Sequence, residues 1–424
     1  MSASKSLTEP PQSDSQDGLK SFQARIVILS FLSYFFYYYT RKNLGIATSS
    51  MIEEGFTEET IGWIQSGYGI LYALGQFICG GLGDKLGARI MIFCGMALSA
   101  IASIAIGFFP LTLVLLIAWP LNGLFQSTGW SNNCKLIATW IPHDSRGRVM
   151  GIWSLCYVLG SISANVVCGY LVEHYNWKLS FLVTGFTVLS VAIIQGLFLI
   201  NRPEQKGFTI QRRNGASAEN ASQKGNFKRM LTNPIILLYG GSYFSLKFIR
   251  YTFFIWLPFY FEKRLNYDTD VSAYSSNAFE VGGVIGLLCG GILADKVFSE
   301  NRGRLAWLGL IALCAALFVF RNYAHSSYLA VLFSLGAVGL FLYIADAQVS
   351  GTAAQDVAGA DAAASATGIV NGLGSVGGAL AGIVPIWIKQ SYGWDGVFLL
   401  FIALTALAIL LTFPVALRRQ VGKA

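Results

Sequence analysis

Two arginines lie deep inside apolar stretches of the sequence, where a positive charge is costly. Arg41 comes sixteen residues after Arg25, and Arg250 comes sixteen residues after Pro234. At about 1.5 Å of rise per helical residue, each guanidinium lies about 24 Å into a hydrocarbon layer of about 30 Å. Because a central arginine costs about 2.5 to 3.5 kcal/mol on insertion, such residues usually face a protein-lined or water-filled cavity. Two guanidinium forks at one depth fit the oxygens of a dianion such as phosphate.

The apolar stretches hold more cations than acids, which leaves a positive field for an anion. The clear acids are Glu280 and Asp346, and the cations are Arg41, Lys42, Lys135, Lys247 and Arg250. Lys247 precedes Arg250 by three residues and shares its helix face, so it is a candidate third phosphate cation. Two alternatives stay open for such residues: pairing with a buried acid, or a side chain that extends to the membrane surface.

The elements that must carry these residues are membrane-spanning helices. The chain has 424 residues, of which 54% are hydrophobic and only 12% are charged, against about 25% charged in a typical globular protein. Twelve apolar stretches are long enough to cross a bilayer, near 25–50, 60–83, 89–109, 111–138, 148–172, 179–200, 235–261, 271–294, 305–321, 327–351, 363–388 and 396–416. The sequence therefore predicts an all-α membrane protein with twelve transmembrane helices.

Lysine and arginine predict the orientation of these spans. They concentrate in the linker 201–234 and at the C-terminal end, 417–424, whereas the loops on the other side carry only Lys178, Lys263, Arg264, Arg321 and Lys389. By the positive-inside rule both termini are cytoplasmic, including a polar tail, 1–24, that we expect to be disordered. The net charge of +8 then reflects topology, and we expect no nucleic-acid partner.

The sequence offers no pattern typical of an enzyme or a metalloprotein. The seven cysteines lie in or beside apolar spans, where cysteine usually behaves as a small hydrophobic residue, so we expect no disulfide. No span combines a nucleophile with a base, a set of metal ligands or a pair of catalytic acids. We therefore expect neither a metal site nor a cofactor.

Two internal similarities indicate a duplicated six-helix unit. Gly80-Gly81-Leu82-Gly83-Asp84-Lys85 follows the second span, and Gly291-Ile292-Leu293-Ala294-Asp295-Lys296 follows the eighth, 211 residues later. At an offset of 217, Tyr175 and Trp177 match Tyr392 and Trp394. The predicted architecture is two pseudo-symmetric bundles, 25–200 and 235–416. Such repeats flank a central substrate site in secondary transporters.

The loop after the second span resembles the signature of the major facilitator superfamily, Gly-x-Leu-x-Asp-Lys-x-Gly-x-Arg. Its positions are Gly80, Leu82, Asp84, Lys85, Gly87 and Arg89. An acid between basic residues can pair with neighbouring helix ends and release them when the two halves rock. We therefore expect Asp84 and its counterpart Asp295 to take part in gating.

Three other stretches are similar to the organophosphate:phosphate antiporter family, which includes the glycerol-3-phosphate and hexose-6-phosphate transporters and a hexose-phosphate sensor. They are Arg41-Lys42-Asn43, the run from Asn122 to Trp130, and Arg250-Tyr251 followed by Trp256 and Pro258. The likeness covers about residues 25 to 416. It implies that Arg41 and Arg250 bind phosphate and that the site is lined by Tyr34, Tyr38, Gln126, Trp130 and Tyr343.

The chain departs from the bacterial glycerol-3-phosphate carriers at two positions. Gln76 stands where they have a lysine, and Cys156-Tyr157 stands where they have a histidine. We include Gln76 and Tyr157 among the candidate substrate contacts. The change leaves the organic part of the substrate open, together with any proton-sensitive recognition of phosphate.

Three further charged residues are candidates for gating. Lys42 lies about 100° around the helix from Arg41, and the family resemblance implies Glu280 as its partner. This pair is either a gate between the halves or a static buried salt bridge. Asp346 either neutralises Lys247 or carries a coupling proton, and the sequence does not decide between them.

The expected function is secondary active transport of a phosphorylated small metabolite, a sugar phosphate or glycerol phosphate, in exchange for inorganic phosphate. We expect a monomer in the bilayer of the bacterial cytoplasmic (inner) membrane. Two alternatives remain: a membrane sensor that binds a sugar phosphate, and a proton-coupled carrier of a non-phosphorylated organic anion.

Overall fold

The computed structural model describes residues 12–208, 229–299, 301–324, 326–352, 357 and 363–417, and these form helices joined by short turns and loops. The first half contains α1 (Gln12–Tyr37), α2 (Tyr39–Glu53), α3 (Glu58–Leu86), α4 (Ala88–Phe108), α5 (Thr112–Gln126), α6 (Thr128–Trp140), α7 (His143–Trp153), α8 (Leu155–His174) and α9 (Trp177–Phe198). The second contains α11 (Pro234–Leu265), α12 (Thr269–Lys296), α13 (Arg302–Tyr323), α14 (Tyr328–Ala347), the π-helix η2 (Gln348–Thr352), α16 (Ala363–Leu380) and α17 (Val384–Ala416).

Several of the twelve predicted spans are built from two helices in sequence. The first is α1 with α2, the fourth is α5 with α6, and the fifth is α7 with α8. The eleventh continues from α16 into the start of α17, and the chain then bends at Gly393, whose φ of 65° is a conformation that favours glycine. Eight helical segments of the described chain are long and apolar enough to cross a membrane by themselves. The all-α, two-half architecture predicted from the sequence is confirmed.

Polar side chains begin several of these helices. Thr57, Asn176, Asn233 and Ser327 each accept a hydrogen bond from a backbone N–H in the first turn, which satisfies a donor that the helix itself cannot. The N-terminal region differs from the expected tail, since it is helical from Gln12 onward. In the linker, a short 3-10 helix, η1, covers Pro203–Lys206, whereas residues 1–11, 209–228 and 418–424 lie outside the described part.

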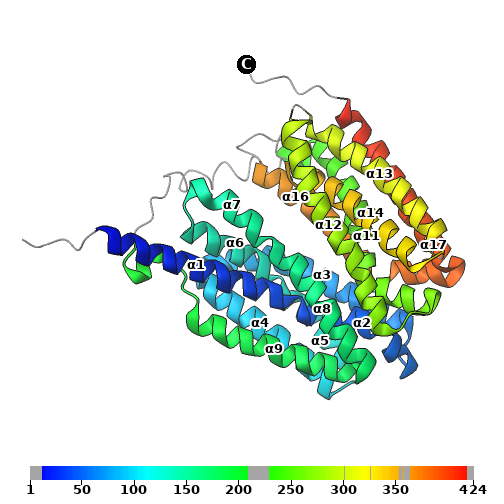
Figure 1. Cartoon of the computed structure of the whole chain (residues 1–424), viewed down its shortest axis with the longest axis horizontal. Coiled ribbons are helices and arrows are strands. Elements are labelled where there is room, and N and C mark those ends of the chain that lie inside the picture. Colours follow the sequence, from blue (N-terminus) through cyan, green and yellow to red (C-terminus); the bar gives the residue numbers. More distant parts are fainter. Residues whose placement is uncertain are drawn as a thin grey trace, which may run out of the picture.

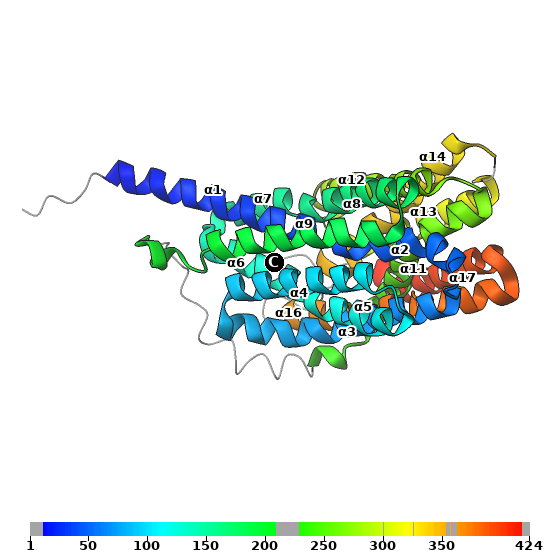
Figure 2. The same ribbon diagram turned by 90° about the horizontal axis from the view of Figure 1, so that it is seen from below.

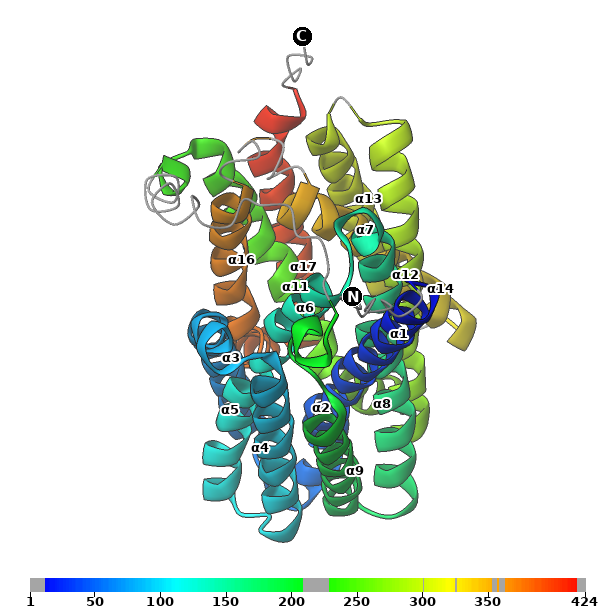
Figure 3. The same cartoon turned by 90° about the vertical axis from the view of Figure 1, so that its left-hand side faces the viewer.

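The two halves form separate bundles that lie against each other. Figure 1 shows the first half in blue to green and the second in green to red, and the end-on view of Figure 3 separates α4 and α9 from α13 and α17. Within the halves, α4 packs on α9 and α12 packs on α14. Between them, α8 packs on α12, α2 on α11, and α3 on α16. These three contacts place the charged residues of both halves around one axis.

The halves are joined at the end of the molecule that lies away from the start of α1 (Figure 2). Lys263 Nζ lies 3.0 Å from Glu53 Oε1, Lys389 pairs with Glu58, and Glu173 accepts a hydrogen bond from the backbone of Thr269. Nearby, α3 and the turn between α16 and α17 come so close that a Cβ on Gly382 would lie 2.6 Å from the Gly62 carbonyl oxygen. This end of the interface is therefore closed.

Candidate functional site

A cavity of about 440 Å³ lies between the two halves, near the middle of the spans. The first half contributes Tyr34, Tyr38, Arg41, Tyr68, Gly69, Tyr72, Ala73, Gln76, Trp130 and Tyr157. The second half contributes Tyr243, Lys247, Arg250, Tyr251, Ser350, Asn371, Ser375 and Gly378. The lining thus contains three cations and, among these residues, no acid. Such a wall favours an anion with a polar, partly stackable body.

Arg41 is held by neutral groups. Its Nε donates to Gln126 Oε1 at 2.7 Å, and its guanidinium carbon lies 4.7 Å from the ring centre of Tyr38 and 5.2 Å from that of Tyr72. Gln126 is fixed in turn, because its amide donates to the Tyr37 carbonyl and to Thr40. The Nη2 of Arg41 is buried and has no hydrogen-bond partner in the described chain, so this nitrogen retains an unused donor.

Arg250 has a different environment. Its Nη1 lies 3.9 Å from Asp346 Oδ1, and its guanidinium carbon stands 4.4 Å from the ring centre of Tyr343. The Tyr343 hydroxyl donates to Glu280 Oε2 at 3.0 Å. The arginine of the second half is therefore beside a resident carboxylate, whereas that of the first half is not.

Lys247 lies in the cavity wall against α16. Its ammonium donates to Ser375 Oγ at 3.1 Å and to the Asn371 carbonyl at 3.4 Å, and it stands 5.0 Å from the ring centre of Tyr243. The alternative in which this side chain extends to the membrane surface does not fit these contacts. The ion pair that Asp346 makes is with Arg250 rather than with Lys247.

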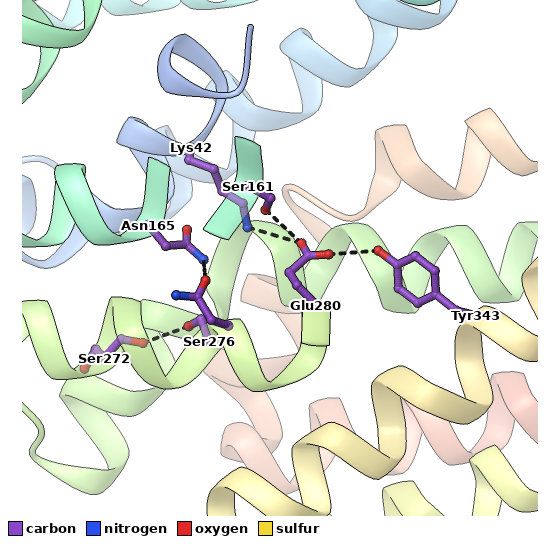
Figure 4. Close-up of polar contacts among 8 residues, drawn as sticks. Lys42, Ser161, Asn165, Ser272, Ser276, Glu280 and Tyr343 are labelled. Carbon is purple, nitrogen blue, oxygen red and sulfur yellow. Dashed lines mark hydrogen bonds and ion pairs between the residues drawn. The ribbon is translucent and has the colours of Figure 1, made fainter. Parts of the chain in front are cut away.

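Lys42 and Glu280 meet across the two halves (Figure 4). Lys42 Nζ lies 3.8 Å from Glu280 Oε1, which also accepts a hydrogen bond from Ser161 at 2.9 Å. One turn along the same helices, Asn165 donates to Asn277 at 2.7 Å. The proximity of the predicted pair is thus found in the structure, and its role as a gate remains a prediction.

Most of the predicted site residues lie around the cavity. Two of them stand behind it: Gln126 is fully buried and orients Arg41, and Tyr343 packs under Arg250. The side chains of Asp84 and Asp295 lie outside the described part, so their predicted gating role is untested. In the described chain, no group of three or more His, Cys, Asp or Glu residues could hold a metal ion.

Several lining residues were missed from the sequence, although helical spacing could have indicated them. Tyr68 and Tyr72 precede Gln76 at intervals of four, and Tyr243 precedes Lys247 by four. In α16, Asn371, Ser375 and Gly378 are separated by four and three. The first two sets lie on helix faces that already held a predicted site residue, Gln76 or Lys247. The third set shares one face of α16.

The sequence profile of the Major Facilitator Superfamily matches residues 30–382. Among curated relatives, a "Probable hexose phosphate transport protein" of Chlamydia pneumoniae is 25% identical and the match covers 93% of this chain and 91% of that protein. "Sugar phosphate exchanger 3" of Xenopus laevis is 27% identical, and the match covers 82% of this chain and 77% of that protein. "Membrane sensor protein UhpC" of Salmonella typhimurium is 24% identical, and the match covers 93% of this chain and 91% of that protein.

The fold is similar to that of a solved bacterial homologue of the human lysosomal transporter Spinster, in an inward-facing and unoccupied conformation. The TM-score is 0.81, and the match covers 95% of this chain and 99% of that one. Because the sequence identity is 14%, this likeness concerns the fold alone.

Proposed function

Because the chain belongs to the major facilitator superfamily, we propose that it is a secondary transporter that exchanges a phosphorylated small metabolite for inorganic phosphate. The observation that carries the proposal is the placement of Arg41 and Arg250, one from each half, on a single cavity. The relatives named as hexose phosphate and sugar phosphate carriers support the substrate class, and the predicted resemblance to the organophosphate:phosphate antiporters is confirmed by them. The protein is accordingly a transporter and not an enzyme.

The arginines bind the phosphate group by charge-assisted hydrogen bonds. A guanidinium matches phosphate oxygens with two parallel donors, and exclusion of water from a buried site strengthens such bonds. Lys247 adds a third positive charge on the side of α16. The organic part then lies among the tyrosine rings, Trp130 and polar side chains such as Gln76 and Asn371, which can stack on a sugar ring and hydrogen-bond its hydroxyl groups.

Transport proceeds by alternating access of this cavity to the two sides of the membrane. The ion pairs of Glu53 and Glu58 join the halves at one end, and these contacts must separate before the cavity opens there. A bound anion offsets the charges of Arg41 and Arg250, which lowers the cost of bringing the halves together around it. In the empty cavity Asp346 stands beside Arg250, whereas Arg41 is held by neutral groups, so the charge of Arg41 is left uncompensated and exchange is favoured over one-way movement.

A sugar-phosphate sensor is the second candidate function. The observation that favours it is the similarity to the Salmonella protein named as a membrane sensor, which spans 93% of this chain. A sensor and a carrier would share the binding cavity. They differ in turnover, because a sensor need not release its ligand on the opposite side.

Binding of phosphate esters tests the substrate class directly. We expect glucose 6-phosphate or glycerol 3-phosphate, and inorganic phosphate, to raise the melting temperature of the purified protein, because a ligand that binds only the folded state stabilises it. Glucose, glycerol and sulfate serve as controls. A shift with unphosphorylated organic acids, and none with any phosphate compound, would instead support a carrier of another anion.

The orientation proposed here places both termini and the 201–234 linker in the cytoplasm of a bacterial cell, with the chain as a monomer in the inner membrane. Tags at either terminus should then be labelled only after the membrane is permeabilised, and a tag inserted after Glu54, which is exposed, should be labelled in intact cells. Labelling of a terminal tag in intact cells would reverse the topology.

A further inference from the structure

The two arginines of the cavity differ in what they contact without a ligand. Arg41 is held by Gln126 and by aromatic rings, and its Nη2 is unpartnered within the described residues. Arg250 lies 3.9 Å from the carboxylate of Asp346. The two groups that are expected to bind the same phosphate therefore differ before a ligand arrives: Arg41 has an unused donor, and Arg250 faces a carboxylate of the protein.

Asp346 is placed to compete with a ligand without contacting it. It is the second-to-last residue of α14, the helix that runs directly into the π-helix η2, and it is 7% exposed. Asp346 does not belong to the cavity lining. Ser350, four residues further along the chain, does. The charged and titratable groups near it are Arg250, Lys247, Tyr243 and Tyr251 from α11 and Tyr157 from α8. The carboxylate thus lies beside Arg250 and next to residues of the cavity wall without belonging to the lining itself.

The pairing of Asp346 with Arg250 is loose. The two closest charged atoms are 3.9 Å apart, and Asp346 Oδ1 has no hydrogen-bond partner in the described chain. A bidentate arginine pair would instead bring both oxygens to about 2.7 to 2.9 Å from nitrogen. A loose pair compensates the charge of Arg250 without using the directional donors of the fork.

We propose that Asp346 is the resident counter-anion of Arg250 in the empty cavity and that the phosphate group replaces it on binding. This inference rests on the proposed function. The ligand first meets the unused donor of Arg41 and then takes Arg250 from Asp346. Asp346 keeps Lys247, the neighbour of Arg250 on α11, as a cation nearby. When the ligand leaves, Asp346 returns to Arg250. Asp346 is accordingly a residue that sets affinity and release, because each ligand must displace the internal anion.

The test is the Asp346→Asn variant, which keeps the shape of the side chain and removes its charge. We expect its dissociation constant for inorganic phosphate to fall about tenfold, within the usual range of coupling between competing groups. In vesicles loaded with phosphate, KM and the maximal rate of exchange should both fall, because binding is tighter and release is slower. Asp346→Glu restores the charge and should return both values toward those of the natural protein.

The matched control is Asp395→Asn. This acid-to-amide change lies at an exposed ion pair with Arg264 and Arg321, away from the cavity, and should leave phosphate affinity unchanged. A second neutral variant, Asp346→Ala, covers the case in which asparagine impairs folding. If the neutral variants that fold bind phosphate with equal or weaker affinity than the natural protein, the inference is wrong. If the natural protein itself does not bind phosphate, the proposed function fails first.

Discussion

Replacing Arg41 with lysine should reduce phosphate exchange at least tenfold while the protein remains folded. Lysine keeps the positive charge, but it cannot donate to Gln126 Oε1 through one nitrogen and hold a phosphate oxygen with the others in a fixed plane. A tenfold loss corresponds to a free energy of about 1.4 kcal/mol. This is less than the free energy that one hydrogen bond to a charged group usually contributes. The measurement is the initial rate of labelled phosphate exchange in reconstituted vesicles.

Arg25→Lys is the matched control for this experiment. Arg25 lies in the same span, where it is exposed and stacks against Phe22 and Phe198, so its replacement should leave exchange close to that of the natural protein. Exchange at the natural rate in the Arg41→Lys variant would place the phosphate site elsewhere. A loss of equal size in both variants would indicate a general effect of the substitution.

Replacing Lys247 with tyrosine should weaken phosphate binding strongly. At an effective dielectric of about 20, a charge some 4 to 6 Å from a phosphate oxygen contributes about 3 to 4 kcal/mol before its desolvation cost. Lys247 lies in the cavity wall, and Gln76 lines the same cavity from the other half. Adding Gln76→Lys should therefore recover part of the lost affinity, as measured by phosphate binding to the purified single and double variants.

The outcome of the Lys247 experiment separates two roles for this residue. If Lys247→Tyr leaves phosphate affinity intact but removes a pH dependence of transport, Lys247 belongs to a proton-coupling element with Asp346, and a proton-coupled carrier replaces the exchanger. If the double variant binds no better than Lys247→Tyr, then a cation at Gln76 cannot reach the phosphate. The Gln76→Lys variant by itself is the control for the added charge.

The placement of Arg41 and Arg250 at a matching level of the two halves could be predicted from the sequence because helix geometry is local and regular. Arg41 and Arg250 are equally far from the start of their spans, and the structure places both on one cavity. The proximity of Lys42 to Glu280 followed from the family resemblance. The faces of Tyr34, Tyr38 and Arg41 followed from their spacing by four and three residues.

The contacts that distinguish the two arginines could not be predicted, because they depend on packing between distant helices. Gln126 stands at the end of α5, where its amide oxygen accepts from Arg41 and its amide nitrogen donates to Tyr37 and Thr40. Asp346 had two possible cationic neighbours on one face of α11, and the position of the end of α14 selects Arg250. Which partner each arginine takes depends on shifts of a few ångströms between packed helices, and the spacing of residues within one helix does not predict these shifts.

The most direct test of the central claim is counterflow in vesicles that contain the purified protein. Vesicles loaded with unlabelled inorganic phosphate should take up labelled phosphate and a labelled sugar phosphate or glycerol phosphate, and uptake should be lost when internal phosphate is omitted or Arg250 is replaced by lysine. Uptake that needs a pH gradient and no internal phosphate, or binding of a phosphate ester with no exchange under any loading, would contradict the claim.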